Sequence, residues 1–189
     1  MPLPRQTILA RASRLFAESG YERTSLKDVA QAVGLSKAAI YHYFATKQEI
    51  YEAIVETLLS ELHDYVASQV DLQIDHPSRL KAFMMAHADY FERHYAEFIT
   101  LLHGVSGIGN PQTPRQIEVR DRYEGLLRGL LAEGETAGAF SGCNVADTAR
   151  AILSMLNWMS RWFDPKGPKR AAILAADFFE VFYCGLAPR

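Results

Sequence analysis

The side chains best suited to recognising another molecule lie in one short stretch, SKAAIYHYF, residues 36–44. In a helix, Ile40 and Phe44 are four positions apart and share one face, which apolar residues of a neighbouring helix can cover. Small side chains on the outer face let a helix approach base edges in the major groove of DNA, while tyrosine hydroxyls and lysines reach phosphate oxygens. The outward side chains here have this character: Lys37, Ala38, Ala39, Tyr41, His42 and Tyr43.

The residues around this stretch predict a helix-turn-helix. Thr24 or Ser25 can cap a helix that runs to about residue 32, Gly34 suits the turn, and Ser36 can cap a second helix over residues 37–44. Two short helices joined by a tight, glycine-containing turn form this motif. The alternative is a helical hairpin inside a larger bundle, with both tyrosines of the second helix buried.

The whole chain predicts an all-α fold of about nine helices. Apolar residues recur at spacings of three and four, and no period-2 strand pattern is present. We expect a three-helix N-terminal domain in residues 1–50 and a helical C-terminal domain in residues 51–189. The expected helices span about residues 6–18, 24–32, 37–44, 47–70, 79–94, 96–103, 115–135, 145–163 and 168–183, with Pro168 in the first turn of the last one.

Charge and composition narrow the class of protein. The net charge is -2, but residues 1–50 hold seven basic and four acidic side chains, and the remainder holds thirteen basic and eighteen acidic ones. A basic N-terminal domain on an acidic remainder is expected if only that domain touches a polyanion. Signal-peptide and membrane-spanning patterns are missing, so we expect a cytoplasmic protein without membrane contact. Cys143 and Cys184 lack a CxxC partner and are expected to be reduced, buried thiols.

Residues 20–54, GYERTSLKDVAQAVGLSKAAIYHYFATKQEIYEAI, resemble the DNA-binding domain of the TetR family of bacterial transcriptional regulators. The family pattern runs G-[FY]-x-x-[TS]-[TS]-x-x-x-[IV]-A and then G-[VL]-S-x-x-x-[LI]-Y-x-[YH]-F-x-x-K. Many members have Gly and Thr where this chain has Ala38 and Ala39, so base specificity does not transfer. The resemblance implies phosphate contacts from Thr24 or Ser25, Ser36, Tyr41, Tyr43 and Lys47, and base contacts from Lys37, Ala38, Ala39 and His42.

The last two long helices carry apolar arcs wider than one buried face requires. This indicates burial on two sides, once against the same chain and once against a second copy. The resemblance implies the same, because the last two helices of TetR-family proteins form a four-helix dimer bundle. A homodimer would read a palindromic double-stranded operator, and the alternative is a monomer with a thick core. The expected interface comprises Ile152, Leu153, Met155, Leu156, Met159, Ile173, Leu174, Phe178, Val181 and Phe182.

The resemblance also implies a ligand-binding pocket inside the C-terminal domain, where a bound ligand shifts the two DNA-binding domains out of register with DNA. The stretch NWMSRWF, residues 157–163, resembles the N-W-x-x-x-W-[FY] segment of family members that answer to acyl-CoA thioesters. Paired indoles can stack on a base or acyl surface while nearby cations meet phosphate, although packed tryptophans beside solvated cations are the alternative. The candidate lining comprises Phe83, His87, Tyr90, Phe91, Phe98, Leu102, His103, Tyr123, Leu127, Trp158, Arg161 and Trp162.

The sequence contains no catalytic, cofactor or metal motif of the GxSxG, P-loop, GxGxxG or HExxH type. His87, His94 and His103 lie within reach of one another, but no cysteine or carboxylate completes a metal site. We therefore predict a non-enzymatic transcriptional regulator, a repressor released by a small hydrophobic effector such as an acyl-CoA thioester. The alternatives are a regulator of an efflux or catabolic gene that answers to a non-CoA aromatic or lipophilic ligand, and an all-α acyl-CoA-handling enzyme.

Overall fold

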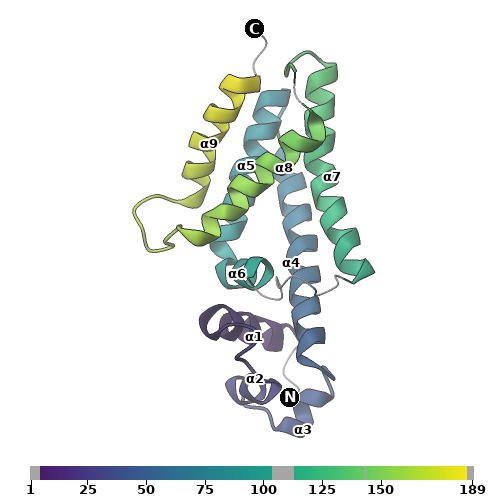
Figure 1. The fold of residues 1–189 in the computed structure, drawn as a ribbon, viewed down its shortest axis with the longest axis vertical. Coiled ribbons are helices and arrows are strands. Elements are labelled where there is room, and N and C mark those ends of the chain that lie inside the picture. Colours follow the sequence, from purple (N-terminus) through teal and green to yellow (C-terminus); the bar gives the residue numbers. More distant parts are fainter. Residues whose placement is uncertain (1–4, 104–112, 143, 187–189) are drawn as a thin grey trace. The chain divides into compact units, whose positions relative to one another are not determined.

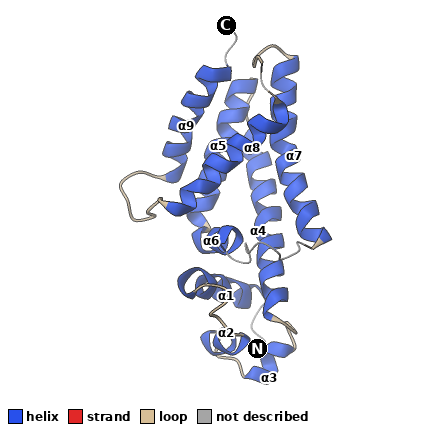
Figure 2. Cartoon of the chain, in the orientation of Figure 1, coloured by secondary structure: helices blue, strands red, loops and turns tan. Residues whose placement is uncertain are grey.

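The computed structural model describes residues 5–103, 113–142 and 144–186. In these residues the chain forms nine α-helices, one 3-10 helix and no strand, which confirms the all-α prediction (Figure 1, Figure 2). No helix among them combines the length and the hydropathy that a membrane span requires. The elements are α1 (Arg5–Ser19), α2 (Leu26–Ala32), α3 (Lys37–Tyr41), α4 (Lys47–Val70), α5 (His76–Arg93), α6 (Tyr95–His103), α7 (Pro114–Thr136), α8 (Val145–Trp158), the 3-10 helix η1 (Met159–Arg161) and α9 (Ala171–Leu186).

The first of two compact units comprises the described parts of residues 1–58 and 95–117. It holds α1, α2, α3, the first half of α4 and α6, and α1 packs against both α2 and α6. Ser13 on α1 donates from its hydroxyl to Glu97 Oε1 at 3.0 Å, and Thr100 on α6 donates to the Ser13 carbonyl at 3.1 Å. The core is apolar and includes Ile8, Ala12, Phe16, Val29, Ile40, Phe44, Ile50, Ile54 and Phe98.

The second unit comprises the described parts of residues 59–94 and 118–189. Helix α5 packs against α9 and α8, and α7 and the second half of α4 complete the unit (Figure 1). Gly134 on α7 lies directly against the ring of Phe140, and a Cβ atom at this position would overlap that ring. The core includes Leu80, Phe83, Met84, Phe91, Leu127, Leu131, Phe140, Ile152, Leu156, Met159 and Phe179.

Two helices begin three residues away from the predicted positions. Helix α5 begins at His76, three residues early, because the Asp75 carboxylate accepts from the Ser78 amide and Pro77 is tolerated in a first turn. Helix α9 begins at Ala171 and not at Pro168. The amide of Ala171 donates to Glu92 Oε2 at 2.8 Å, so a side chain of α5 caps this helix.

Three helices end three or more residues away from the predicted positions. Helix α3 ends at Tyr41, short of Phe44, and α9 continues through Gly185 to Leu186. Helix α8 ends at Trp158, since the amide of Trp162 donates to the carbonyl of Met159 in a 3-10 turn.

Candidate nucleic-acid interface and effector site

Local hydrogen bonds fix the helix-turn-helix of the first unit. Ser25 caps α2 reciprocally: its amide donates to Asp28 Oδ2 at 2.8 Å and its hydroxyl accepts from the Asp28 amide at 3.2 Å. The Ser25 hydroxyl also donates to Asp28 Oδ2 at 2.7 Å, and this bond, together with that from the Ser25 amide, holds the pKa of Asp28 below its ordinary value. Gly34 has a φ of +71°, where an L side chain would be strained, and the Leu35 amide donates to the Ala30 carbonyl at 2.9 Å. The predicted caps and turn are therefore confirmed.

The third helix presents the predicted outer face. Ser36 caps α3 by accepting from the Ala39 amide at 3.1 Å. Ile40 and Phe44 are buried, which confirms that they belong to the core of this unit. The side chains left outside are Lys37, Ala38, Tyr41 and His42, which are exposed, and Ala39 and Tyr43, which are half-buried.

Two of the residues with predicted phosphate contacts, Thr24 and Lys47, donate to main-chain carbonyls. Thr24 is buried and its hydroxyl donates to the Gly20 carbonyl at 2.9 Å, so Ser25 is the member of this pair with an exposed side chain. The ammonium group of Lys47 donates to the Tyr21 carbonyl at 2.7 Å. The spacing of residues in the sequence did not indicate either contact, because each joins residues that lie outside α3.

A buried polar pair lies in the second unit among predicted ligand-binding residues. His87 Nδ1 and the Tyr123 hydroxyl are 2.7 Å apart, and the Phe83 ring stacks on Tyr123 with 5.5 Å between centroids. Burial lowers the pKa of His87 from 6.5 to about 4 and raises that of Tyr123 well above its ordinary value. Both groups are therefore neutral near pH 7.

The remaining predicted ligand residues belong to different parts of the described chain. Tyr90, Phe91 and Leu127 are buried in the core of the second unit, together with the pair above. Phe98 and Leu102 lie on α6, in the first unit. The side chain of His103 lies outside the described part of the chain.

The tryptophans of the predicted acyl-CoA segment are exposed. Trp158 is 63% exposed and Trp162 is 49% exposed, since η1 ends the helix between them. The Arg161 guanidinium lies 5.8 Å from the Trp158 ring, in reach of a cation–π contact. Two basic residues that follow this segment in the sequence form ion pairs: Lys169 with Asp177 at 3.2 Å and Arg170 with Glu92 at 2.9 Å.

The residues predicted for the dimer interface differ in how far their own chain buries them. Ile152, Leu156 and Met159 are covered by their own chain, so we correct the prediction for these three: they form core. On α9, Ile173 is 50% exposed and Val181 is 73% exposed. The other members are half-buried: Leu153, Met155, Leu174, Phe178 and Phe182.

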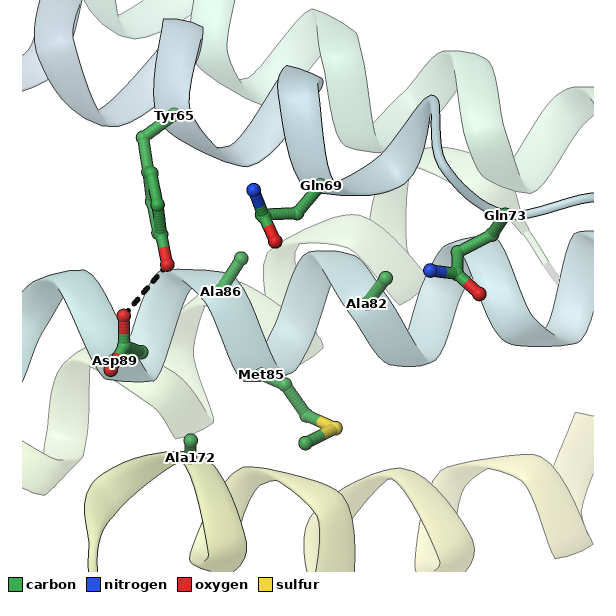
Figure 3. Close-up of a pocket in the computed structure, with 8 residues that line it drawn as sticks. All are labelled: Tyr65, Gln69, Gln73, Ala82, Met85, Ala86, Asp89 and Ala172. Carbon is green, nitrogen blue, oxygen red and sulfur yellow. Dashed lines mark hydrogen bonds between the residues drawn. The ribbon is translucent and has the colours of Figure 1, made fainter.

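The second unit also contains a groove of about 390 Å³ that the sequence did not indicate. Tyr65 closes one end, where its hydroxyl donates to Asp89 Oδ2 at 2.8 Å (Figure 3). Arg93 forms an ion pair with the same carboxylate at 2.5 Å. The available sequence signal was two pairs of residues four apart: Gln69 at the end of α4 with Gln73 just beyond it, and Ala82 with Ala86 on α5. The groove is lined by Tyr65 and Gln69 from α4, Gln73 from the turn that follows α4, Ala82, Met85, Ala86 and Asp89 from α5, and Ala172 from α9.

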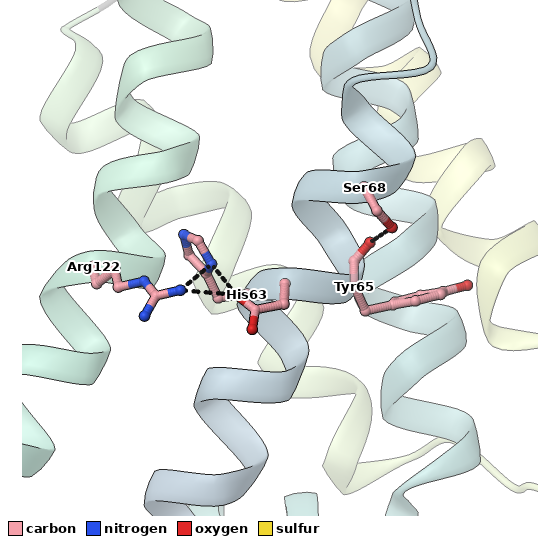
Figure 4. A network of polar contacts seen from close by, with 5 residues as sticks. His63, Tyr65, Ser68 and Arg122 are labelled. Atoms are coloured by element: carbon pink, nitrogen blue, oxygen red, sulfur yellow. Dashed lines mark hydrogen bonds and ion pairs between the residues drawn. The ribbon is translucent and has the colours of Figure 1, made fainter.

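A polar network joins α4 to α7 on the other side of α4 (Figure 4). Arg122 donates to His63 Nδ1 at 2.9 Å and to Asp64 Oδ1 at 2.8 Å, and these two acceptors are 3.0 Å apart. A ring nitrogen cannot accept from Arg122 while it donates to Asp64, so a ring with its proton on Nε2 alone makes the first contact and a ring with a proton on Nδ1 makes the second.

No group of His, Cys, Asp or Glu in the described residues is arranged to hold a metal ion. Cys184 on α9 is exposed, which corrects the expectation of a buried thiol, and Cys143 lies outside the described residues.

Comparison with known proteins identifies the family. The model described as "Bacterial regulatory proteins, tetR family" matches residues 8–54, and "Tetracyclin repressor-like, C-terminal domain" matches residues 73–186. The HTH-type transcriptional repressor KstR2 of Mycobacterium tuberculosis is 24% identical over 184 residues, which cover 96% of this chain and 92% of that protein.

Solved structures of regulators share the fold. The TetR family transcriptional regulator PfmR from Thermus thermophilus is 40% identical, with a TM-score of 0.87 and full coverage of both chains. AibR in complex with isovaleryl coenzyme A and operator DNA is 25% identical, with a TM-score of 0.80 and coverage of 97% of this chain and 98% of that one. The chain is therefore a member of the TetR family of bacterial regulatory proteins, which are transcriptional regulators and not enzymes.

Proposed function

We propose that this protein is a repressor that binds a palindromic operator as a homodimer and leaves it when a small hydrophobic effector binds the second unit. The observation that supports operator binding best is the outer face of α3, where Tyr41 and His42 are exposed although Ile40 fills the core. Its small and polar side chains fit a major groove. In this proposal Lys37, Ala38, Ala39 and His42 meet bases, and Ser25, Ser36, Tyr41 and Tyr43 meet phosphates.

The dimer is supported by exposed apolar side chains on α8, η1 and α9. Trp158, Trp162, Ile173 and Val181 are large hydrophobic residues that a monomer in water has no reason to expose together. A two-fold dimer places two recognition helices on half-sites about 34 Å apart, or a multiple of that spacing. Light scattering at micromolar concentration should give twice the chain mass of 21.2 kDa, and a mass of one chain would refute the dimer.

An acyl-CoA thioester is the effector that we favour. The support is the exposed segment Trp158–Arg161–Trp162, which offers two indoles and a guanidinium to a nucleotide, and the likeness to AibR, whose structure holds isovaleryl coenzyme A. The observation that favours a second candidate, a non-CoA aromatic or lipophilic effector, is the burial of His87 and Tyr123 among apolar rings. That site offers two neutral hydrogen-bonding groups, which suit an uncharged polar group on a lipophilic molecule.

Selection of bound DNA from a random pool tests operator binding, and competition with effectors then tests the class of effector. Operator binding requires enrichment of a palindrome, and a pool without enrichment at low salt would refute it. Acyl-CoAs of several chain lengths, the matching free acids and coenzyme A alone are then added to the complex. Release by acyl-CoA only supports the thioester, whereas release by free acids or aromatic compounds with equal potency supports the second candidate.

Variants of α3 test the assignment of roles. Tyr41→Ala removes a phosphate contact and is expected to weaken binding to every sequence alike. His42→Ala removes a base contact and is expected to relax preference at one operator position, at a cost of about 1–3 kcal/mol on the preferred sequence. Repeating the selection with each variant measures both effects, and equal losses on all sequences for both variants would contradict the assignment.

A further inference from the structure

The groove between α4, α5 and α9 is polar on one side and apolar on the other. The apolar side consists of the α5 side chains Ala82, Met85 and Ala86. On the polar side, Gln69 and Gln73 point towards α5 (Figure 3). A molecule in the groove of about 390 Å³ therefore meets hydrogen-bonding groups along one side and hydrocarbon along the other.

The two glutamine amides can serve a ligand. Gln69 donates to the neighbouring Ser68 hydroxyl at 3.3 Å, which is long for a hydrogen bond from nitrogen to oxygen. Gln73 is exposed in the turn just beyond α4. Each amide has two donor hydrogens and one acceptor oxygen, so a carboxamide on a ligand can pair with it as donor and acceptor at once.

The end of the groove at Tyr65 holds a carboxylate whose charge is balanced. Asp89 Oδ2 accepts from the Tyr65 hydroxyl at 2.8 Å and forms an ion pair with Arg93 at 2.5 Å. The Arg93 guanidinium also lies 4.5 Å from the centroid of the Tyr65 ring. Burial, and next the Asp89 carboxylate, raise the pKa of Tyr65, so its hydroxyl stays protonated. Both contacts are made to Oδ2, so Oδ1 is the oxygen that can accept from a ligand.

A balanced carboxylate selects against ligands of either charge. An ammonium group at this end would meet the Arg93 guanidinium as a like charge, and a carboxylate would meet Asp89 in the same way. Repulsion between two unit charges about 4 Å apart in water corresponds to about fivefold in affinity, and to more beside a protein. The N–H group of an uncharged amide can donate to Asp89 without this repulsion.

The groove is separate from the buried pair in the same unit. His87 lies two residues from both Met85 and Asp89, so at about 100° per residue it faces the opposite side of α5. Its ring contacts Tyr123 on α7, whereas α4 and α9 flank the groove. A ligand can therefore occupy the groove without displacing the buried pair.

We propose that the groove is a binding site for uncharged carboxamides with a short hydrocarbon body. The amide meets Asp89 and Gln69, and the hydrocarbon lies on Ala82 and Ala86. Arg93 balances Asp89 and thereby sets the preference for an uncharged head group. The site goes beyond the proposed regulator, because its ligand requires neither an operator nor the tryptophan segment, and its tests contain no DNA.

Hexanamide, hexanoate and hexylamine share a hydrocarbon chain and differ in the charge of the head group near neutral pH. NMR titration follows the labelled methyl group of Met85, which is assigned by its loss in Met85→Leu, with the buried Met159 as internal reference. Hexanamide should give a saturable shift at about millimolar concentration and bind about fivefold more tightly than either charged probe. The absence of a saturable shift, or a charged probe that binds as tightly, overturns the proposal.

Variants of the ion pair test the origin of this preference. Asp89→Asn still accepts from Tyr65 but leaves Arg93 unbalanced, so hexanoate should become the tightest probe. Arg93→Gln leaves Asp89 unbalanced and should favour hexylamine in the same way. Asp147→Asn and Arg150→Gln alter an exposed ion pair on α8 and are the matched controls, in which hexanamide should remain the tightest probe. An unchanged order in both groove variants overturns the proposal.

A filled groove tests where the amide binds. Ala82→Leu adds a larger side chain on the apolar side of the groove, and Ala132→Leu makes the same change on the exposed face of α7. Affinity for hexanamide should fall at least about fivefold in the first variant and stay at the wild-type value in the second. Thermal denaturation confirms that both are folded; if Ala82→Leu is not, the ion-pair variants decide. Wild-type affinity in folded Ala82→Leu would place the amide outside the groove and overturn the proposal.

Discussion

The buried His87 makes the stability of the second unit depend on pH in a predictable way. Its folded-state pKa of about 4 lies below the ordinary value of 6.5, since burial penalises the charged ring. Between these values the unfolded chain binds a proton that the folded chain does not. Stability from this group is therefore complete above pH 6.5, is lost as the pH falls towards 4, and changes no further below that.

The two pKa values set the size of the effect. The difference between 6.5 and about 4 corresponds to about 3 kcal/mol of the free energy of unfolding over the whole range. Between pH 7 and pH 5 the loss is about 2 kcal/mol, because most of the titration of the unfolded ring falls within that interval. This loss is a substantial fraction of the stability of a typical domain.

Urea unfolding followed by tryptophan fluorescence measures this loss of stability, since both tryptophans, Trp158 and Trp162, lie in the unit that holds His87. The wild-type protein and His87→Gln are compared from pH 7 to pH 5; glutamine retains a polar partner for Tyr123 but does not titrate. The variant is expected to be less stable at pH 7 and to lose about 2 kcal/mol less on acidification.

Tyr123→Phe is the matched control for this experiment. It removes the hydroxyl that meets His87 but leaves the ring buried, so the acid-dependent loss should persist if burial is its cause. Parallel loss of stability in the wild type and in His87→Gln would refute the reasoning, because it would mean that His87 binds protons equally in the folded and unfolded states.

The packing of both units makes further predictions. Gly134→Ala should lower the free energy of unfolding by about 1–3 kcal/mol because the new Cβ overlaps Phe140, whereas Gly129→Ala on the same helix meets nothing within 4 Å and should raise it by about 0.5–1 kcal/mol. Thermal denaturation compares the two, and equal melting temperatures would contradict the close packing. Ile40→Ala should cost about 2–5 kcal/mol of stability, whereas Tyr41→Ala should leave the melting temperature unchanged and weaken operator binding; circular dichroism and gel shift separate these outcomes.

The helix-turn-helix could be predicted from the sequence because each of its signals is local. Ser25 and Ser36 accept from amides three residues away, and Gly34 has the positive φ that its position in the turn requires. Ile40 and Phe44 are buried as their spacing of four indicates. No contact between distant parts of the chain was needed to place the outer face of α3.

The starts of α5 and α9 show where local rules are insufficient. We read Pro77 as part of a linker, although its fixed φ also suits the first turn that Asp75 caps. At α9 the same rule favoured Pro168, but the cap comes from Glu92, which lies 79 residues away in the chain. A tertiary hydrogen bond of this kind has no signature near the helix that it starts.

The same limit applies to the site residues. Thr24 and Lys47 are polar and lie where the family pattern implies phosphate contacts, yet their side chains are engaged by the carbonyls of Gly20 and Tyr21. Donor chemistry alone does not distinguish a phosphate from a main-chain oxygen. The structure separates them because it shows which acceptor is already within hydrogen-bonding distance.

The segment Trp158–Arg161–Trp162 bears on two parts of the proposed function, the dimer and the effector. A helix continued to Phe163 would have kept Trp158 and Trp162 on one face, but η1 intervenes. Both indoles are exposed, and the Trp162 ring lies 6.3 Å from the Phe178 ring of α9. If these rings bind effector in one state and a second copy in another, the two events compete for the same surface. Acyl-CoA should then weaken the dimer as well as the operator complex, whereas an effector held by the buried His87 site would leave the dimer intact.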